Sequence, residues 1–285
     1  MKTTSFELKA SGPVRLFGLG WEPVNVPVKT VIVLVHGLGE HTGRYKELAR
    51  FFTSRGCALY GCDLRGHGRS PGKRGHALYP QLLNDLSELI QYAERQHPGL
   101  PLILYGHSMG GNIAANFVLD RPEVQKALKA VVLSSPWLRL NIPVSPVVVQ
   151  LSRLMQKVYP SFTQKNKINA EWLSKDPLEV KAYQEDPLVH PYISVSLFYQ
   201  VHEHGMGAVR KAKKLSLPLL VMHGSEDRIT SCEASRRLAE KAPHAQWKLW
   251  KGVRHEPHHE LEKREVMQFV WEWMEELLQQ KPVNE

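Results

Sequence analysis

One serine in this chain stands at a spacing that points to nucleophilic chemistry. Residues 106–110 read GHSMG, the pattern G-x-S-x-G, and directly follow the apolar run PLILY. Between a strand and a helix, this pattern forms a sharp turn that holds the serine hydroxyl clear of the sheet. The glycines let the strand and the helix approach closely, and the helix N-terminus favours an anion at that point. We therefore predict that Ser108 is a nucleophile.

A serine hydroxyl becomes an effective nucleophile only when a neighbouring base removes its proton. For a nucleophile on such a turn, the partners follow in the order acid, then histidine. The motif HGSED supplies Glu226 and Asp227, and the later motif GVRHEP supplies His255. Both motifs follow apolar runs that are typical of strands, so their side chains are expected above the same sheet. The order predicts His255 as the base and leaves the acid open between Glu226 and Asp227.

The segment around His255 also matches a zinc motif. Residues 255–259 read HEPHH, which fits the H-E-x-x-H pattern of metalloproteases. That site needs a helix to bring both histidines to one face, and Pro257 stands between them, where a helix interior does not tolerate proline. A third ligand in the right context is also missing. We therefore expect no metal and no cofactor, and we expect His259 to be a polar surface residue.

Strands and helices alternate along most of the chain. A β-hairpin region is expected over residues 1–30. Near-continuous apolar runs then predict strands at 31–37, 57–63, 101–108, 129–135, 217–227 and 245–252. Amphipathic patterns predict helices at 45–56, 79–99, 109–122 and about 260–280, and Thr230 and Glu233 stand at capping-box spacing before another helix. This alternation predicts an α/β fold with a mostly parallel sheet that is covered by helices on both faces.

The alternation stops in the second half of the chain. Residues 137–215 contain no comparable apolar strand and are interrupted by several prolines. We predict a helical cap over 137–215, inserted between the sixth and seventh main strands of a core formed by 1–136 and 216–285.

The composition is that of a basic globular protein. The chain has 285 residues and a formal net charge of +9, from 37 basic and 28 acidic side chains. Such a charge could favour nucleic acid or an anionic surface. The densest basic cluster, Arg210, Lys211, Lys213 and Lys214, is nevertheless typical of a solvated helix face, and no nucleic-acid motif surrounds it. We expect no nucleic-acid partner.

The three cysteines are too few for a disulfide framework, and we expect reduced thiols. Cys57 and Cys62 are separated by an odd number of residues, which places them on opposite faces of one strand. The start MKTTSFELKA lacks a signal-peptide core, and no run approaches the roughly 18 apolar residues of a membrane span. These features predict a cytoplasmic protein.

Five motifs, taken together, resemble a known family. HGLGEHTGRY (36–45), DLRGHGRS (63–70), GHSMGG (106–111), HGSEDRI (223–229) and GVRHEPHHE (252–260) occur in order. They resemble the α/β-hydrolase fold, and specifically the monoacylglycerol lipase and lysophospholipase family of serine hydrolases. The resemblance spans about residues 25–280, and its most family-specific piece is HG-x-GEH-x-GRY.

The resemblance implies a catalytic triad of Ser108, Asp227 and His255. It also implies an oxyanion hole formed by the backbone N–H groups of Leu38 and Met109.

The family's contacts with the glycerol head group match Glu40, Arg44 and His258. Glu40 and Arg44 could instead pair with each other and brace the loop. We expect a structural role for His36, and we expect DLRGHGRS to be a turn fixed by hydrogen bonds of its own side chains.

The resemblance further implies that the cap forms an apolar tunnel for an acyl chain. An excess of apolar surface on the cap would also serve lipid entry or transient contact with a membrane surface. The expected activity is hydrolysis of a monoacylglycerol through an acyl-enzyme. Alternatives on the same triad are a lysophospholipase, a thioesterase or a general carboxylesterase. A lipid-binding receptor on a hydrolase scaffold is the non-enzymatic alternative.

Overall fold

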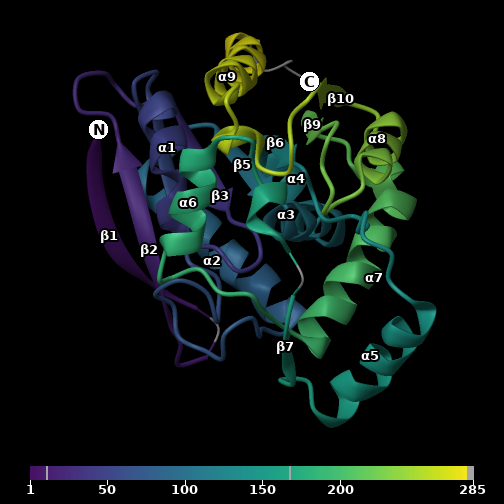
Figure 1. The fold of residues 1–285 in the computed structure, drawn as a ribbon. Helices are drawn as coiled ribbons and strands as arrows, with labels where there is room; N and C mark the ends of the chain where they lie inside the picture. Colours follow the sequence, from purple (N-terminus) through teal and green to yellow (C-terminus); the bar gives the residue numbers. More distant parts are fainter. Residues whose placement is uncertain (11, 167, 281–285) are drawn as a thin grey trace.

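An eight-stranded sheet runs through the protein in the order β1-β2-β4-β3-β5-β6-β9-β10. The computed structural model describes residues 1–10, 12–166 and 168–280 (Figure 1). The first two strands pair antiparallel with each other, β2 pairs antiparallel with β4, and all the later pairs are parallel. The predicted mostly parallel α/β sheet is confirmed. Its strands are β1 (Lys2–Lys9), β2 (Arg15–Glu22), β3 (Thr30–Val35), β4 (Cys57–Cys62), β5 (Leu102–His107), β6 (Leu128–Ser134), β9 (Leu219–Gly224) and β10 (Ala245–Trp250).

Helices cover both faces of this sheet. The helices α1 (Lys46–Thr53) and α9 (Lys263–Gln279) bury apolar side chains on one face. The other face packs against α2 (Tyr79–Gln96), α3 (Met109–Asp120) and α8 (Cys232–Lys241), and the short α4 (Val124–Ala127) precedes β6. Because both faces are covered, the inner strands β3, β4, β5 and β9 are buried at every position rather than at alternate ones. The two faces also explain why Cys57 and Cys62 fall in different apolar clusters, as their spacing predicted.

A long insertion separates β6 from β9. Its elements are α5 (Pro146–Val158), β7 (Thr163–Lys165), α6 (Pro177–Glu185), β8 (Tyr192–Ser194) and α7 (Val195–Lys211). The strands β7 and β8 form a small antiparallel sheet that the sequence did not predict, because three residues are too few to show an alternating pattern. The helix α7 packs on α3 and α8. The division into a core of 1–136 and 216–285 and a cap of 137–215 therefore stays a prediction.

The start of α8 differs from the prediction. Ser231, not Thr230, caps this helix, and its side chain accepts a hydrogen bond from the amide of Ala234. Thr230 instead donates its hydroxyl to Asp227 Oδ2 at 2.8 Å. The capping-box prediction was wrong because a carboxylate in the preceding loop competes for the same hydroxyl.

Two surface features can be read directly from the fold. Arg210, Lys211, Lys213 and Lys214 are exposed, as a solvated helix face requires. Within the described residues, no helix combines the length and apolarity that a bilayer crossing demands.

Two glycines on α7 offer a matched test of how closely this helix approaches the loop after β6. A Cβ at Gly205 would lie 2.5 Å from the carbonyl oxygen of Leu138, whereas a Cβ at Gly207 would meet only Arg210 Nη2, at 3.9 Å. We expect Gly205→Ala to lower the free energy of unfolding by roughly 1–3 kcal/mol through overpacking. Gly207→Ala should raise it by about 0.4–1 kcal/mol, because alanine restricts the unfolded chain. Urea denaturation measures both, and equal effects of the two changes would contradict the proposed close contact.

Candidate active site

Ser108 occupies a strained turn between β5 and α3. Its φ is 52° and its ψ is −117°, a left-handed conformation that a non-glycine residue rarely adopts. A Cβ at Gly106 would lie 2.5 Å from the carbonyl oxygen of Gly110, and a Cβ at Gly110 would lie 2.1 Å from that of Val35. The glycines of the motif are therefore required by contact between the turn and strands β3 and β5. This packing maintains the strain and fixes the position of the serine.

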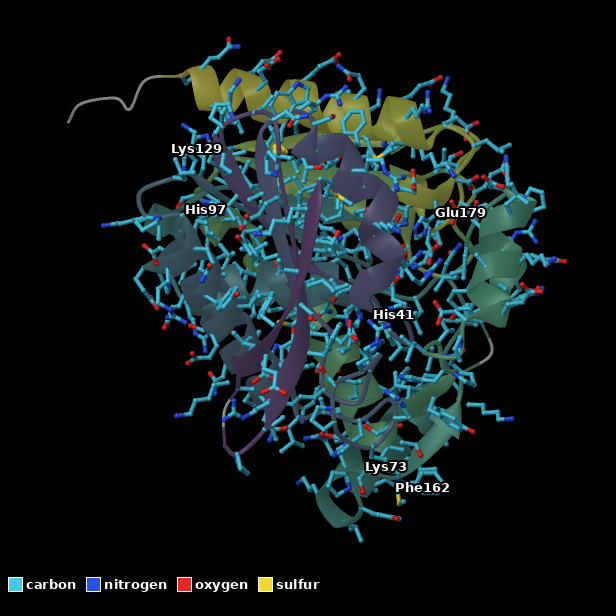
Figure 2. All side chains as sticks on the ribbon, turned by 90° about the vertical axis from the view of Figure 1, so that its left-hand side faces the viewer. His41, Lys73, His97, Lys129, Phe162 and Glu179 are labelled. Carbon is cyan, nitrogen blue, oxygen red and sulfur yellow. The ribbon has the colours of Figure 1, made fainter. Side chains whose placement is uncertain are left out.

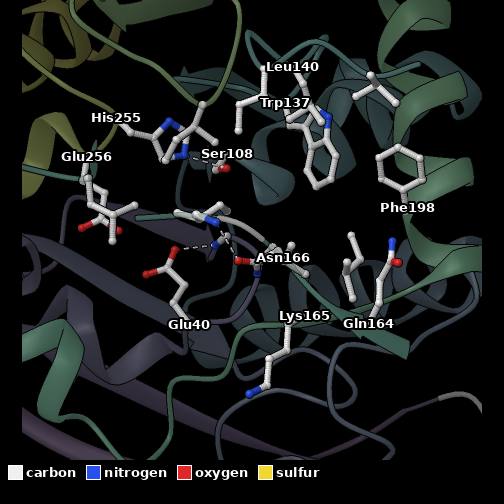
Figure 3. Close-up of a pocket in the computed structure, with 18 of the residues that line it drawn as sticks. Glu40, Ser108, Trp137, Leu140, Gln164, Lys165, Asn166, Phe198, His255 and Glu256 are labelled. Carbon is white, nitrogen blue, oxygen red and sulfur yellow. Dashed lines mark hydrogen bonds between the residues drawn. The ribbon is translucent and has the colours of Figure 1, made fainter. Parts of the chain in front are cut away.

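Three loops bring a serine, a histidine and an aspartate into one hydrogen-bonded line. His255 Nε2 lies 2.9 Å from Ser108 Oγ, and His255 Nδ1 lies 2.7 Å from Asp227 Oδ2 (Figure 3). Asp227 follows β9 and His255 follows β10, so both side chains project from the carboxyl edge of the sheet. These are the distances that transfer of a proton from a serine to a histidine, oriented by a carboxylate, requires.

Glu226, the other candidate acid, faces away from this line. Half of its side chain is exposed, and its carboxylate pairs with Lys175 at 3.0 Å. The geometry favours Asp227 as the partner of His255.

The carboxylate of Asp227 is buried and holds several hydrogen bonds. Its Oδ1 accepts from the amides of Ile229 at 2.7 Å and Thr230 at 3.0 Å. Burial by itself would raise the pKa of Asp227, but the charge of His255 and hydrogen bonds from His223 and His255 lower it well below its usual range. Burial would likewise lower the pKa of His255, yet the Asp227 carboxylate raises it. An ionised acid thus faces a histidine that holds a proton more readily than usual.

The loop after β3 lies against the serine. A Cβ at Gly37 would lie 3.2 Å from Ser108 Cβ, and the next residue, Leu38, lines the adjacent pocket. Met109 is the first residue of α3, so its N–H is among those that a helix leaves without an intrahelical partner. The two predicted oxyanion donors therefore flank Ser108, and their role stays a prediction.

A buried ionic cluster stands behind the loop that carries Leu38. Arg44 donates to Glu40 Oε2 at 2.9 Å and, through two nitrogens, to both oxygens of Glu256 at 2.8 Å. Glu40 Oε1 in turn accepts from the amide of Gly37 at 2.6 Å and from the hydroxyl of Tyr45 at 2.8 Å. Glu40 and Arg44 therefore brace the loop, which was the alternative that their spacing left open.

His259 belongs to this cluster and is not on the surface. Only 3% of it is exposed, and its Nδ1 lies 2.7 Å from Glu256 Oε2. The prediction of a surface residue was wrong because residues 257–259 form a 3-10 turn that directs both of its histidines inward. His255 and His259 face different partners, Ser108 and Glu256. In the part of the chain described, no group of three or more His, Cys, Asp or Glu side chains is placed to hold a metal ion.

His258 is also buried, but it forms no hydrogen bond. Its ring stacks on Tyr45 with centroids 4.7 Å apart and meets His107 edge-on at 4.7 Å. Both ring nitrogens lack a partner among the described residues. Burial lowers the pKa of His258 well below its usual value, so the ring is neutral. Of the three predicted substrate contacts, Glu40 lines the pocket whereas Arg44 and His258 lie behind its wall.

A structural role is predicted for His36, and the turn of residues 63–70 is predicted to be fixed by hydrogen bonds. The hydrogen bonds of the structure fit both predictions. His36 accepts from the amide of Leu64 at 2.8 Å, and Asp63 accepts from the amides of Thr42 and Arg69 at 2.8 Å. In the same turn, Arg65 forms a buried ion pair with Asp85.

A mostly apolar cavity of about 420 Å³ opens beside Ser108. Its wall is formed by residues that follow β6 and by residues of the insertion. Figure 3 shows Trp137, Leu140 and Phe198 on one side of Ser108, with His255, Glu256 and Glu40 on the other. Gln164, Lys165 and Asn166 supply polar groups farther from the serine. The site therefore combines an activated serine, an apolar chamber and a polar wall.

Comparisons with known proteins show which proteins this chain resembles. A family profile described as serine aminopeptidase, S33, matches residues 26–262. A monoacylglycerol lipase of Mycolicibacterium smegmatis is 35% identical over 92% of this chain and 94% of its own length. An uncharacterized abhydrolase domain-containing protein of Dictyostelium discoideum is 33% identical over 91% of this chain, which covers 27% of that longer protein. The crystal structure of Paleococcus ferrophilus monoacylglycerol lipase matches with a TM-score of 0.83 and 32% identity, over 92% of this chain and 98% of that one.

The cluster around Arg44 predicts a stability that depends on pH. Burial would raise the pKa of Glu256, but the charges of Arg44 and His259 lower it well below its usual range. A depressed carboxyl pKa stabilises the fold above the unfolded pKa of about 4.3, and this contribution is lost as pH falls through the acid range. We expect Glu256→Gln to lower the free energy of unfolding at pH 7 by about 3 kcal/mol, with a smaller deficit at acid pH.

Glu226→Gln is the control, because the half-exposed pair of Glu226 with Lys175 should contribute less than about 1 kcal/mol. Urea denaturation at pH 7 and at acid pH measures both variants. Equal stability of the two variants at pH 7 would contradict the assigned role of the buried cluster.

Proposed function

We propose, from the premise that this chain belongs to the serine aminopeptidase S33 family, that it hydrolyses monoacylglycerols to fatty acid and glycerol. The observation that carries the proposal is the hydrogen-bonded line of Ser108, His255 and Asp227 at the mouth of an apolar cavity. The similarity to monoacylglycerol lipases supports the same class of substrate.

The proposed reaction proceeds through an acyl-enzyme. Ser108 Oγ attacks the ester carbonyl while His255 Nε2 takes the hydroxyl proton, and Asp227 stabilises the resulting imidazolium. The amides of Leu38 and Met109 donate to the oxyanion of the tetrahedral intermediate. When the ester bond breaks, His255 gives its proton to the departing glycerol oxygen. A water molecule, activated in turn by His255, then attacks the acyl-enzyme, and the fatty acid leaves.

The charges around the serine favour an uncharged leaving group. Glu40 and Glu256 both line the cavity, whereas Arg44, which pairs with them, does not. Burial would raise the pKa of Glu40, but Arg44 lowers it, so the carboxylate is ionised. The two carboxylates thus face the cavity while their partners Arg44 and His259 lie behind its wall, so a phosphate of a lysophospholipid or of an acyl-CoA placed beside them would be repelled. Glycerol, with neutral hydroxyl groups, fits this wall best, and Glu40 is the residue that we propose to contact it.

The helix α5 supports contact with a membrane surface. It carries large exposed apolar side chains, including Leu151 (57% exposed), Leu154 (62%) and Val158 (83%). Lys73 lies over the ring of Tyr159 just beyond the helix, and Figure 2 shows Lys73 close to Phe162 at this tip of the molecule. Apolar side chains beside cations are typical of surfaces that bind lipid headgroups. We propose that the protein is cytoplasmic and that α5 rests transiently on the membrane from which the substrate enters.

The proposed chemistry predicts how activity responds to changes in the triad. Ser108→Ala should abolish hydrolysis, and Asp227→Asn should lower kcat by about 10⁴-fold. Glu226→Gln should retain the activity of the unaltered protein, because this side chain faces Lys175. Fluorophosphonate labelling and monoacylglycerol hydrolysis measure these effects, and labelling of Ser108→Ala would refute the assigned nucleophile.

The same assay distinguishes the substrates. We expect kcat/KM to be higher for a monoacylglycerol than for a lysophospholipid or an acyl-CoA of equal chain length, because of the negative wall. A higher kcat/KM for either phosphate-containing ester would favour the lysophospholipase or thioesterase alternative. Equal values for every ester, including short p-nitrophenyl esters, would indicate a general carboxylesterase. Tight lipid binding without turnover of any ester would indicate a receptor.

The membrane proposal predicts the effect of changing α5. We expect the double change Leu151→Ser and Leu154→Ser to weaken binding to vesicles that contain anionic phospholipid by at least about tenfold, because two apolar side chains are lost. Leu178→Ser on α6 is the control, since Leu178 is 76% exposed but lies away from this helix. Vesicle sedimentation measures binding. Equal binding of the double variant and the control would contradict a role for α5.

A further inference from the structure

The carboxylate that faces His255 also faces a second buried histidine. His223 is the penultimate residue of β9 and has no exposed surface. Its Nε2 lies 2.9 Å from Asp227 Oδ2, the same oxygen that lies 2.7 Å from His255 Nδ1. One carboxylate oxygen is thus shared by two imidazoles, only one of which reaches Ser108.

The surroundings of His223 fix which of its nitrogens carries the proton. Nε2 also lies 3.2 Å from the carbonyl oxygen of Thr230. A carbonyl and an ionised carboxylate can only accept hydrogen bonds, so Nε2 must be the donor. On the other side of the ring, Nδ1 lies 2.9 Å from the hydroxyl of Ser235, which can donate to it. These contacts fit an imidazole whose Nε2–H donates toward Asp227.

His223 also connects the loop that carries Asp227 to rigid elements of the fold. Asp227 and His255 lie in loops, whereas His223 lies in β9 and Ser235 lies in α8. A hydrogen bond from a strand residue therefore holds the carboxylate against the scaffold of the sheet. Active-site groups keep their geometry best when such fixed neighbours support them.

We infer that His223 is a positioning residue that holds Asp227 toward His255 and limits how strongly Asp227 attracts the proton of His255. This inference rests on the proposed triad. A permanent donor to Asp227 stabilises the ionised carboxylate and makes it a weaker acceptor for the imidazolium. Without that donor, the pKa of His255 rises, and the neutral base is available only at higher pH.

Other ionisable groups face this pair, and none of them substitutes for His223. Among the described residues, only His223 and His255 place ionisable donors within hydrogen-bond distance of the Asp227 carboxylate. Glu40 and Glu256 act on His255 through their charges, whereas His107 and Cys232 are neutral groups that lie near His255 and Asp227.

Two substitutions at the same position separate positioning from packing. His223→Leu keeps an apolar filling but removes the donor, whereas His223→Gln keeps an amide N–H that can reach Asp227. We expect His223→Leu to lower kcat about tenfold, as the loss of a hydrogen bond to a charged group implies, with little change in KM. The acid limb of the kcat/KM profile against pH should move to higher pH. His223→Gln should restore both kcat and the position of this limb toward those of the unaltered protein.

The outcome that overturns the inference is an acid limb that stays in place in His223→Leu, or one that moves equally in the Leu and Gln variants. Nitrogen-15 NMR of the histidine-labelled protein tests the same claim without depending on the folding of the Leu variant. The signal that disappears in His223→Gln should report protonation at Nε2 and not at Nδ1, and the opposite tautomer would refute the donor role. Hydrolysis by Ser108→Ala would instead overturn the proposed function itself, so the two failures are distinguishable.

Discussion

Three loops at the carboxyl edge of the sheet bring Ser108, Asp227 and His255 together, and the contact of 2.9 Å between Ser108 Oγ and His255 Nε2 depends on them. The loops follow β5, β9 and β10, which run parallel, so their carboxyl ends point the same way. Neighbouring strands lie about 4.8 Å apart. The strands β9 and β10 are neighbours and one strand, β6, separates them from β5, so short loops bring the three side chains into contact. The loop that carries Leu38 follows β3, which pairs with β5 in the same direction. The parallel pairing thus brings Ser108, His255, Asp227 and the loop that carries Leu38 together.

The buried ionic cluster joins two of these loops to each other. Arg44 donates to Glu40, which accepts from the amide of Gly37 in the loop that carries Leu38. Arg44 also donates to Glu256, the neighbour of His255 in sequence. A shift of either loop would separate charges that are out of contact with water, and such separation is costly. The cluster therefore couples the position of His255 to that of the loop that carries Leu38. It also places the carboxylates of Glu40 and Glu256 on the wall of the pocket.

The sequence predicted the parts of this structure that local pattern determines. The apolar runs of β3, β5 and β9 identified buried strands, and the glycines around Ser108 identified the turn. The inward position of His259 could not be predicted, because it depends on Arg44, a residue more than 200 positions away in the chain. The contact between His223 and Asp227 could not be predicted from the sequence. His223 lies at the end of an apolar run, and Asp227 becomes its neighbour only when the loop after β9 folds back. The sequence feature that marks His223 is the dipeptide His-Gly at the end of a strand. The same dipeptide occurs at His36, before the loop that carries Leu38.

The histidines around Ser108 differ in how readily they take a proton, and His255 is the one suited to the proposed role of base. Burial lowers the pKa of His107 to about 4 and that of His258 well below its usual value, so both rings are neutral near pH 7. Burial would also lower the pKa of His255, but the Asp227 carboxylate raises it. The ring of His107 lies 5.0 Å from that of His255, and a proton on it would repel the proton that His255 takes from the serine. Because these neighbours stay neutral, His255, whose pKa the Asp227 carboxylate raises, is the imidazole beside Ser108 that is suited to take its proton.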